Sequence, residues 1–172
     1  MESLWLEVLV NLKWHKYHVH TFDYVIEGII EECKNNIPRE VIGFLVGMYC
    51  RWQNEYFTLI DDYIPVRGTG DQYHVVMDVD AVANAIRTLS KRYNDAKHLI
   101  VGWYHSHPGY GLFLSDIDII SHSTFFNQPY HVALVVDPLK KEYGFFKLSI
   151  NGKPIRVSHV IWRRVHEEYE ET

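Results

Sequence analysis

The sequence predicts an α/β protein in which helices flank a mixed β-sheet. Short apolar, β-branched runs alternate with amphipathic stretches of helical period along the chain, which is typical of a sheet covered by helices. Asn151 and Gly152 lie between two such runs and indicate a β-hairpin, so antiparallel strands occur as well. A chain of 172 residues, 47% of them apolar, suffices for one domain and is short for two. We therefore expect a single domain over residues 1–172.

Charge and composition exclude several classes of protein. The formal charge of −5 and the lack of a basic tract argue against binding to nucleic acid. No apolar run approaches the roughly 20 residues that span a bilayer, so we expect no membrane partner. The apolar residues 4–10 are interrupted by Glu7 and follow no basic segment, which argues against a signal peptide. The two cysteines, Cys33 and Cys50, indicate no disulfide framework, so we expect a cytoplasmic protein.

The N-terminal part is predicted as an arm, a strand and a helix. Residues 1–16 are rich in apolar and aromatic side chains and form either an added strand or a partner-binding arm. Residues 17–21 are typical of a strand, whose alternation puts His18 and His20 on one polar face. A helix capped by Thr21 follows. A cysteine on its apolar stripe is expected to be a buried filler and not a nucleophile. That stripe consists of Phe22, Val25, Ile26, Ile29, Ile30 and Cys33.

The next part is predicted as a hairpin, a connection and a second helix. Residues 41–46 and 56–60 are the apolar cores of two strands joined by a short turn. Residues 66–77 show little periodicity, so on their own they indicate a surface connection. Asp80 is expected to cap the second helix. The inner face of this helix is expected to carry Val82, Ile86, Leu89 and Tyr93.

The most informative stretch lies between residues 99 and 118. Residues 99–104 are typical of a buried strand, and His105 and His107 follow at its C-terminal end, where side chains two apart point to the same side. After a turn rich in glycine, Ser115 and Asp118 have the spacing of a capping box, which opens a helix through about residue 126. We therefore expect His105, His107 and Asp118 to meet at one point.

Two imidazoles and one carboxylate suit a divalent metal ion. They make three ligands of a zinc site with a fourth position left for water, which distinguishes a catalytic zinc site from a structural one. Zinc is not the only ion that accepts these ligands, and two histidines one residue apart are a weak signal in a chain with 11 histidines. His122, four residues after Asp118, is either an extra ligand or a partner of the ligands. Because three ligands are already present, we expect it to be exposed or supporting.

Beyond the helix that begins after Ser115, the C-terminal part is predicted to form three strands and a last helix. Residues 130–136 are typical of a buried strand, and residues 143–150 and 153–160 flank the hairpin turn. Residues 161–171 are predicted to be an amphipathic helix with an acidic end. The helix that begins after Ser115 is expected to turn inward Ile119, Ile120, Ser123 and Phe126.

The whole motif resembles the signature of the JAMM (MPN+) metalloproteases, over roughly residues 17–150. The short sequence segments at residues 102–104 and 135–138 are most similar to those of the proteasome-lid deubiquitinase members and their archaeal-type homologues. The main departure is at Leu112 and Phe113, where the lid enzyme has cysteine and tryptophan. The positions that match the signature are Glu40, followed by Gly43, Leu45 and Gly47, and then His105, His107, Ser115 and Asp118.

This resemblance implies a fold, a cofactor and a reaction. The fold is the three-layer α-β-α sandwich with a mixed sheet, similar to that of cytidine deaminases. One zinc ion per chain is expected on His105, His107 and Asp118. Glu40, which the sequence alone indicates to be a solvated residue before a strand, becomes the general base and acid, and Ser115 stabilises the oxyanion. The implied substrate bond is the isopeptide or peptide bond after the C-terminal Gly-Gly of ubiquitin or a ubiquitin-like modifier.

The resemblance also implies where substrate binds. Residues 68–76 match an insertion beside the active site, and an exposed backbone there can add an extended tail as a strand. The implied substrate-binding residues are Gly68, Thr69, Gly70, Val75, Val76, Trp103 and Phe113.

Three alternatives stay open at this point. Some MPN domains are non-catalytic scaffolds, although those lack the ligand set that is complete here. In a second enzyme interpretation, the chain processes a sulfur-carrier protein or a small peptide instead of a ubiquitin conjugate. A catalytic chain of this kind can also be latent until it meets a partner MPN subunit or the proteasome. The expected partners are therefore conjugates of ubiquitin or a ubiquitin-like modifier, with such an assembly as a further one.

Overall fold

The computed structural model describes residues 18–52, 54–66 and 77–163. Their helices are α2 (Asp23–Asn35), α3 (Val79–Arg92) and α4 (Asp116–Phe125), and none is long and apolar enough to cross a membrane. The features predicted for residues 1–17, 67–76 and 164–172 lie outside the described residues. The strands are β1 (Val19–Phe22), β2 (Ile42–Trp52), β3 (Glu55–Pro65), β4 (Leu99–Ser106), β5 (Val132–Asp137), β6 (Glu142–Leu148), β7 (Pro154–Val157) and β8 (His159–Trp162).

These strands form one mixed sheet in the order β7-β6-β5-β4-β2-β3-β1-β8. Strand β4 runs parallel to β5, and β1 runs parallel to both β3 and β8. The other neighbouring pairs are antiparallel, including the three hairpins β2–β3, β5–β6 and β6–β7. The predicted mixed sheet is therefore confirmed. Strands β4 and β2, which lead to the candidate site, lie in its middle.

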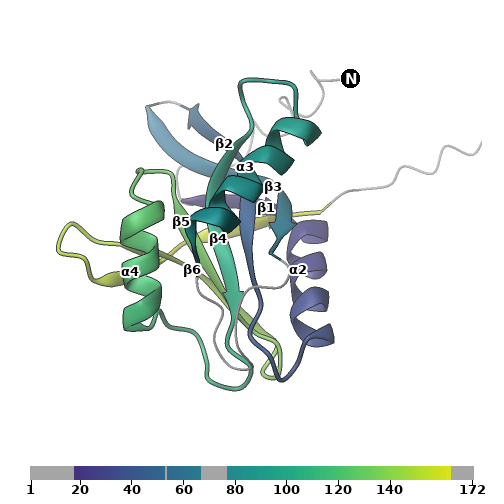
Figure 1. Cartoon of the computed structure of the whole chain (residues 1–172). Helices are drawn as coiled ribbons and strands as arrows, with labels where there is room; N and C mark the ends of the chain where they lie inside the picture. Colours follow the sequence, from purple (N-terminus) through teal and green to yellow (C-terminus); the bar gives the residue numbers. More distant parts are fainter. Residues whose placement is uncertain (1–17, 53, 67–76, 164–172) are drawn as a thin grey trace, which may run out of the picture.

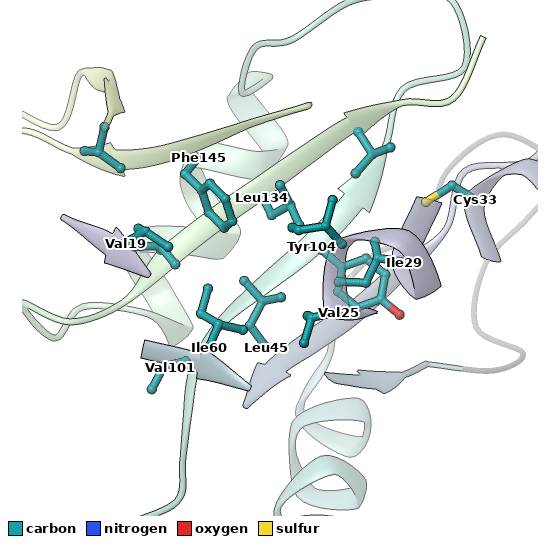
Figure 2. Close-up of a cluster of buried hydrophobic side chains, with 14 of the residues drawn as sticks. Val19, Val25, Ile29, Cys33, Leu45, Ile60, Val101, Tyr104, Leu134 and Phe145 are labelled. Carbon is teal, nitrogen blue, oxygen red and sulfur yellow. The ribbon is translucent and has the colours of Figure 1, made fainter. Parts of the chain in front are cut away.

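Helices cover both faces of the sheet, and Figure 1 shows α2 and α4 on opposite sides of the strands. Helix α2 buries Val25, Ile29 and Cys33 in a cluster with strand residues of one face (Figure 2). On the other face, α3 contributes Ala81 and Ala85, and the ends of α4 are flanked by the buried Leu114 and Phe126. Each fully buried aliphatic or phenylalanine side chain contributes about 1.5–3 kcal/mol to folding. This arrangement confirms the predicted three-layer α-β-α sandwich.

Both predicted hairpins are present. In the first, Trp52 pairs with Glu55, and Asn54 between them has φ +68°, a left-handed conformation that asparagine tolerates. In the second, Asn151 and Gly152 connect β6 to β7, and Gly152 has φ +72°.

Three element boundaries differ from the prediction. Thr21 does not cap α2, because it belongs to β1, and Phe22 precedes the helix without a side-chain cap. Helix α3 is capped by Asp78 and not by Asp80: the side chain of Asp78 accepts a hydrogen bond from the backbone N–H three residues later. Residues 161 and 162 lie in β8, which pairs with β1, so the predicted C-terminal helix does not begin there.

The buried faces of α3 and α4 also differ from the prediction. Ile86 and Ile120 were expected to face inward, but they are 51% and 65% exposed, and Ser123 is exposed as well. The helices bury small or polar side chains instead, which let them pack close to the sheet. The buried residues of the two helices are Ala81, Ala85, Ser121 and His122.

Two residues of uncertain role at the sequence level are both buried. His20 was predicted on a polar face, but it is fully buried, packs against Phe57 and accepts a hydrogen bond from Trp162 (Nε1–Nδ1 3.2 Å). Cys33 is fully buried as predicted. Burial, with the neighbouring Glu32, raises the pKa of its thiol to about 12, so it is no thiolate at neutral pH.

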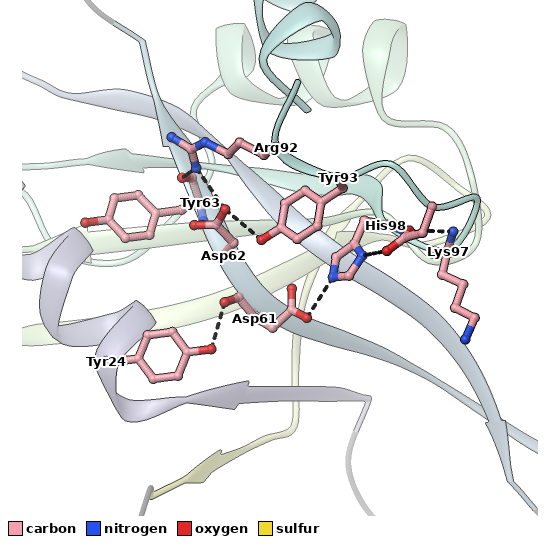
Figure 3. Close-up of polar contacts among 9 residues, drawn as sticks. Tyr24, Asp61, Asp62, Tyr63, Arg92, Tyr93, Lys97 and His98 are labelled. Atoms are coloured by element: carbon pink, nitrogen blue, oxygen red, sulfur yellow. Dashed lines mark hydrogen bonds and ion pairs between the residues drawn. The ribbon is translucent and has the colours of Figure 1, made fainter. Parts of the chain in front are cut away.

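Polar contacts fasten the C-terminal end of α3 to β3 (Figure 3). Asp62 of β3 accepts hydrogen bonds from Arg92 (Nη1–Oδ2 2.8 Å) and from the hydroxyl of Tyr93 (2.9 Å). Arg92 also donates to the carbonyl oxygen of Tyr63 at 3.0 Å. These bonds hold the helix end against the strand.

His98, just before β4, continues this cluster. Its Nδ1 lies 2.8 Å from Oδ2 of Asp95, its Nε2 lies 3.1 Å from Oδ2 of Asp61, and its ring stacks on Tyr93 with centroids 3.8 Å apart. Burial lowers the pKa of His98, but the two carboxylates outweigh burial and raise it. We call the following residues the α3 anchor: Asp61, Asp62, Arg92, Tyr93, Asp95 and His98.

Candidate active site

Strand β4 and the residue that follows it present two histidines from the middle of the sheet. His105 lies opposite Ile42 of β2 and Val135 of β5. His107 is held by its backbone N–H, which donates to the carbonyl oxygen of Val136 at 2.8 Å. Each histidine is only 5% exposed, so both rings are fixed by their surroundings.

The loop after His107 is organised by Asp137, a fully buried residue at the end of β5. Its carboxylate accepts hydrogen bonds from the backbone N–H groups of Gly109 and Gly111 at 2.9 Å and of Leu139 and Lys140 at 3.1 Å. Burial would raise the pKa of Asp137, but these N–H donors lower it. Gly109 and Gly111 have φ of +85° and +88°, which other residues adopt only under strain. Asp137 therefore fixes the turn that returns the chain to α4.

The predicted capping box at the start of α4 is confirmed. The Ser115 hydroxyl oxygen accepts a hydrogen bond from the backbone N–H of Asp118 at 3.2 Å. In return, Oδ2 of Asp118 accepts from both the backbone N–H and the hydroxyl of Ser115, each at 2.7 Å. Burial would raise the pKa of Asp118, but hydrogen bonds from His105 and Ser115 lower it to about 2. The carboxylate is therefore ionised at neutral pH.

Donor atoms of His105, His107 and Asp118, which we call the ligand cluster, converge on one point. The two Nε2 atoms are 3.1 Å apart, and Oδ2 of Asp118 lies 3.4 Å from that of His105 and 3.7 Å from that of His107. A tetrahedral ion with bonds of about 2.0–2.1 Å separates its ligands by about 3.3 Å. Burial, and next the neighbouring His105, lower the pKa of His107 to about 4, which leaves its lone pair free at neutral pH. The cluster therefore fits a divalent metal ion such as zinc.

The two imidazoles have different neighbours. Nδ1 of His107 lies 3.3 Å from the carbonyl oxygen of Gly111, and its ring contacts Phe113 with centroids 4.7 Å apart. The ring of His105 stacks on Trp103, with centroids 4.6 Å apart and an interplanar angle of 14°. Trp103 is 1% exposed, so it supports His105 from behind and offers no surface to substrate, contrary to its predicted role. Phe113 is 46% exposed, and its substrate contact stays a prediction.

Glu40 lies at the same end of the sheet as the ligand cluster. The next residue, Val41, donates its N–H to the hydroxyl oxygen of Ser106 and accepts from the N–H of Ser106, both at 2.9 Å. Ser106 lies between the two histidines in the sequence, so these bonds hold the backbone next to the half-buried Glu40 against the strand that carries His105. Its catalytic role, like that of Ser115, stays a prediction.

The structure answers one open question about His122. This side chain is 4% exposed, and its Nδ1 accepts a hydrogen bond from Nε1 of Trp103 at 3.1 Å. Among the described residues, the group able to hold a metal consists of His105, His107 and Asp118, so His122 has the supporting role and is not exposed. The sequence signal for Asp137, an acid ending a buried strand before proline, indicated no role in the loop. The predicted substrate residues outside the described part are Gly68, Thr69, Gly70, Val75 and Val76.

Comparison with known proteins agrees with this geometry. Residues 14–128 match the family described as JAB1/Mov34/MPN/PAD-1 ubiquitin protease. The chain is 33% identical over 132 residues to the 26S proteasome regulatory subunit RPN11 of Eremothecium gossypii, which covers 75% of this chain and 40% of that protein. It is 32% identical to the ubiquitin carboxyl-terminal hydrolase RPN11 of Saccharomyces cerevisiae, with 75% and 41% covered. It is 39% identical over 109 residues to COP9 signalosome complex subunit 5 of Kluyveromyces lactis, with 61% and 27% covered.

A solved structure is similar in fold. The solution structure of a Desulfitobacterium hafniense protein superposes with a TM-score of 0.66 over 90% of this chain and 99% of that one, at 16% identity. That likeness supports the fold alone. The chain spans about 40% of the length of the RPN11 proteins that it matches.

Proposed function

Because the chain belongs to the JAB1/Mov34/MPN/PAD-1 family, we propose that it is a zinc-dependent protease that hydrolyses the bond after the C-terminal Gly-Gly of ubiquitin or a ubiquitin-like modifier. The observation that carries this proposal is the convergence of two imidazole nitrogens and one carboxylate oxygen within 3.1–3.7 Å of one another. The names of the relatives supply the substrate class, since one of them is a ubiquitin carboxyl-terminal hydrolase. Within this class, the proposed scissile bond is the isopeptide bond that joins the modifier to a lysine side chain.

The proposed zinc ligands are His105, His107 and Asp118, with one ion per chain. When bound by these three side chains, a zinc ion would supply an acidified water and a Lewis acid for the scissile carbonyl group. The low pKa of His107 and of Asp118 keeps both side chains in the forms that bind a cation near neutral pH.

Glu40 is the proposed general base and acid. Its carboxylate takes a proton from the attacking water and then gives a proton to the departing lysine amine. Such proton transfers contribute about two to four decades in rate. The hydrogen bonds between Val41 and Ser106 support this role, because they hold the backbone beside Glu40 against the strand that carries the ligands.

Ser115 is the proposed donor to the oxyanion of the tetrahedral intermediate. Its hydroxyl donates to Oδ2 of Asp118 in the structure, so in catalysis it turns from the ligand oxygen toward the substrate oxygen. A single oxyanion donor is worth about 3 kcal/mol of transition-state stabilisation. Its capping of α4 continues through its backbone and its hydroxyl oxygen.

A cleavage assay with matched glutamate variants tests the proposal. The substrate is a ubiquitin conjugate with an isopeptide bond, and the enzyme is the zinc-loaded chain, Glu40→Gln, and Glu31→Gln as an exposed control. We expect Glu40→Gln to lose at least about 100-fold in turnover with unchanged zinc content, and Glu31→Gln to match the wild type.

The outcomes separate the alternatives. Turnover retained by Glu40→Gln would contradict its role. Cleavage of a short Gly-Gly peptide but not of the folded conjugate would replace the proposed substrate class with small peptides. A zinc-loaded wild type that cleaves neither substrate would contradict activity of the isolated chain and favour a latent enzyme.

A further inference from the structure

We propose that Trp103 and His122 are positioning residues that fix the ring of His105 for the metal. This inference rests on the proposed metal site but not on the proposed protease reaction. It assigns a function to a buried pair that touches neither metal nor substrate.

The two histidine ligands are oriented in different ways. A histidine that binds a metal usually donates its other ring N–H to an oxygen acceptor, which sets the tautomer and the ring orientation. His107 has such an acceptor, the carbonyl oxygen of Gly111 at 3.3 Å from Nδ1. Nδ1 of His105 is buried and has no hydrogen-bond partner within the described part of the chain. For His105, packing must therefore supply the orientation that the Gly111 acceptor gives to His107.

That packing is provided by the indole of Trp103. The two rings are nearly parallel, 4.6 Å apart at an angle of 14°, and Phe126 stacks near-parallel to the indole at 6.0 Å. The indole is in turn oriented by its hydrogen bond to Nδ1 of the buried His122 at 3.1 Å. Tilting the indole would leave a buried N–H without an acceptor, which strongly disfavours the movement. The hydrogen bond to His122 thus fixes the plane of the indole, and the stacked indole in turn fixes the plane of the His105 ring.

Strand β4 and helix α4 each carry one ligand and one supporting residue. Trp103 and His105 are two apart on β4 and point to one side, and Asp118 and His122 are four apart on α4 and share a face. The contact between Trp103 and His122 at 3.1 Å therefore repeats, one step along both elements, the contact between His105 and Asp118 at 3.4 Å. These two successive side-chain contacts fix how β4 and α4 lie relative to each other.

Metal affinity of a set of variants tests the proposal without any protease assay. Trp103→Phe keeps an aromatic ring but removes the N–H donor, and His122→Leu removes the acceptor. We expect each to weaken zinc binding by about 10-fold or more, as loss of a ligand's support does elsewhere. The double variant is expected to lose no more than about 3-fold beyond either single one, because both remove the same bond. His122→Gln, whose amide oxygen accepts the indole N–H, is expected to bind zinc within about 3-fold of the wild type.

His131→Leu is the matched control. His131 is also buried, at 9% exposure, and also packs against Phe126, with ring centroids 5.4 Å apart. It is expected to lower thermal stability without changing the zinc Kd. Zinc Kd is measured by competition with a chromophoric chelator. The visible spectrum of the cobalt-loaded chain reports on ligand geometry. It is expected to change in Trp103→Phe and His122→Leu, and to stay as in the wild type in His122→Gln and His131→Leu.

Each possible result supports or overturns the positioning role. Wild-type zinc affinity in Trp103→Phe and His122→Leu would overturn the positioning role and leave the metal site intact. An equal loss in His131→Leu would overturn it too, because general loosening of the core would then explain the effect. If His122→Leu does not fold, Trp103→Phe against His122→Gln makes the same comparison. A wild type that binds no zinc would overturn both this inference and the proposed metal site.

Discussion

The ligand cluster and the α3 anchor both combine histidine with aspartate, at opposite ends of β4, with opposite results. In the anchor, the two ring nitrogens of His98 face two different carboxylates, those of Asp95 and Asp61. In the ligand cluster, two imidazole nitrogens face each other at 3.1 Å and share one carboxylate oxygen. In the anchor, each ring nitrogen of His98 has its own carboxylate partner, whereas the ligand cluster gathers three acceptors around a point that suits a cation.

The pKa shifts of the two clusters have opposite directions. Burial lowers the pKa of His98, but its two carboxylates outweigh burial and raise it, so the anchor favours the protonated ring. Burial and the neighbouring His105 lower the pKa of His107 to about 4, which keeps that ring neutral. The arrangement of histidines and acids, and not their presence, therefore separates a structural ion pair from a metal site.

Chelation is expected to produce the largest difference between the two clusters. Phenanthroline should abolish turnover, because the proposed reaction needs the ion that the ligand cluster is proposed to bind, and should leave the anchor intact. N-ethylmaleimide should have no effect on turnover, because burial raises the pKa of Cys33 to about 12 and that of Cys50 to about 11. Loss of turnover on alkylation, with none on chelation, would contradict the mechanism.

Ser115→Ala is expected to affect the ligand cluster in two measurable ways. Loss of the oxyanion donor should lower kcat by about 100- to 1000-fold. Loss of the cap should lower the free energy of unfolding by about 1 kcal/mol. Asp78→Ala is the control, since it removes the side-chain cap of α3 and should lower stability alike without lowering kcat. Equal kcat values in Ser115→Ala and the wild type would remove Ser115 from the catalytic residues.

His98→Gln is expected to have the smallest effect, and only on the stability of the anchor. Because the folded-state pKa of His98 is raised, its stabilisation is fully present below its unfolded pKa of about 6.5 and is lost as pH rises through the folded value. The variant should therefore cost about 1 kcal/mol near pH 5.5 and less near pH 9. Thermal unfolding should show this as a Tm difference of about 2–4 °C that shrinks with pH. A difference that grows with pH would contradict the ion-pair account.

Local rules predicted the ligand cluster from the sequence. Strand alternation put His105 and His107 on one side, and the capping-box spacing put Asp118 in the first turn of a helix that the glycine loop returns to the strand end. Glu40 had no such local signal. A glutamate before a strand is usually solvated, so only the resemblance to a family indicated its role.

The features that the sequence did not predict depend on contacts between distant residues. The residue pairs that build the α3 anchor from β3 and from residues 92–98 are about 30 or more positions apart. Strand β8 replaces the start of a predicted helix because it pairs with β1, at the opposite end of the chain. Ile86 looked like a core residue by its period, but Ala81 and Ala85 allow the closer approach of α3 to the sheet. Side-chain packing of this kind has no signature in a single sequence.

The zinc content of the purified chain and of two variants shows whether the ligand cluster is a metal centre. Bound zinc per chain is measured by mass spectrometry of the metal for the wild type, Asp118→Ala and His98→Gln after dialysis against a weak chelator. We predict one zinc in the wild type, none in Asp118→Ala and one in His98→Gln, because within the described part of the chain the ligand cluster is the group able to hold a metal ion. A wild type without zinc, or zinc retained in Asp118→Ala, would contradict the claim that these three side chains form a metal centre.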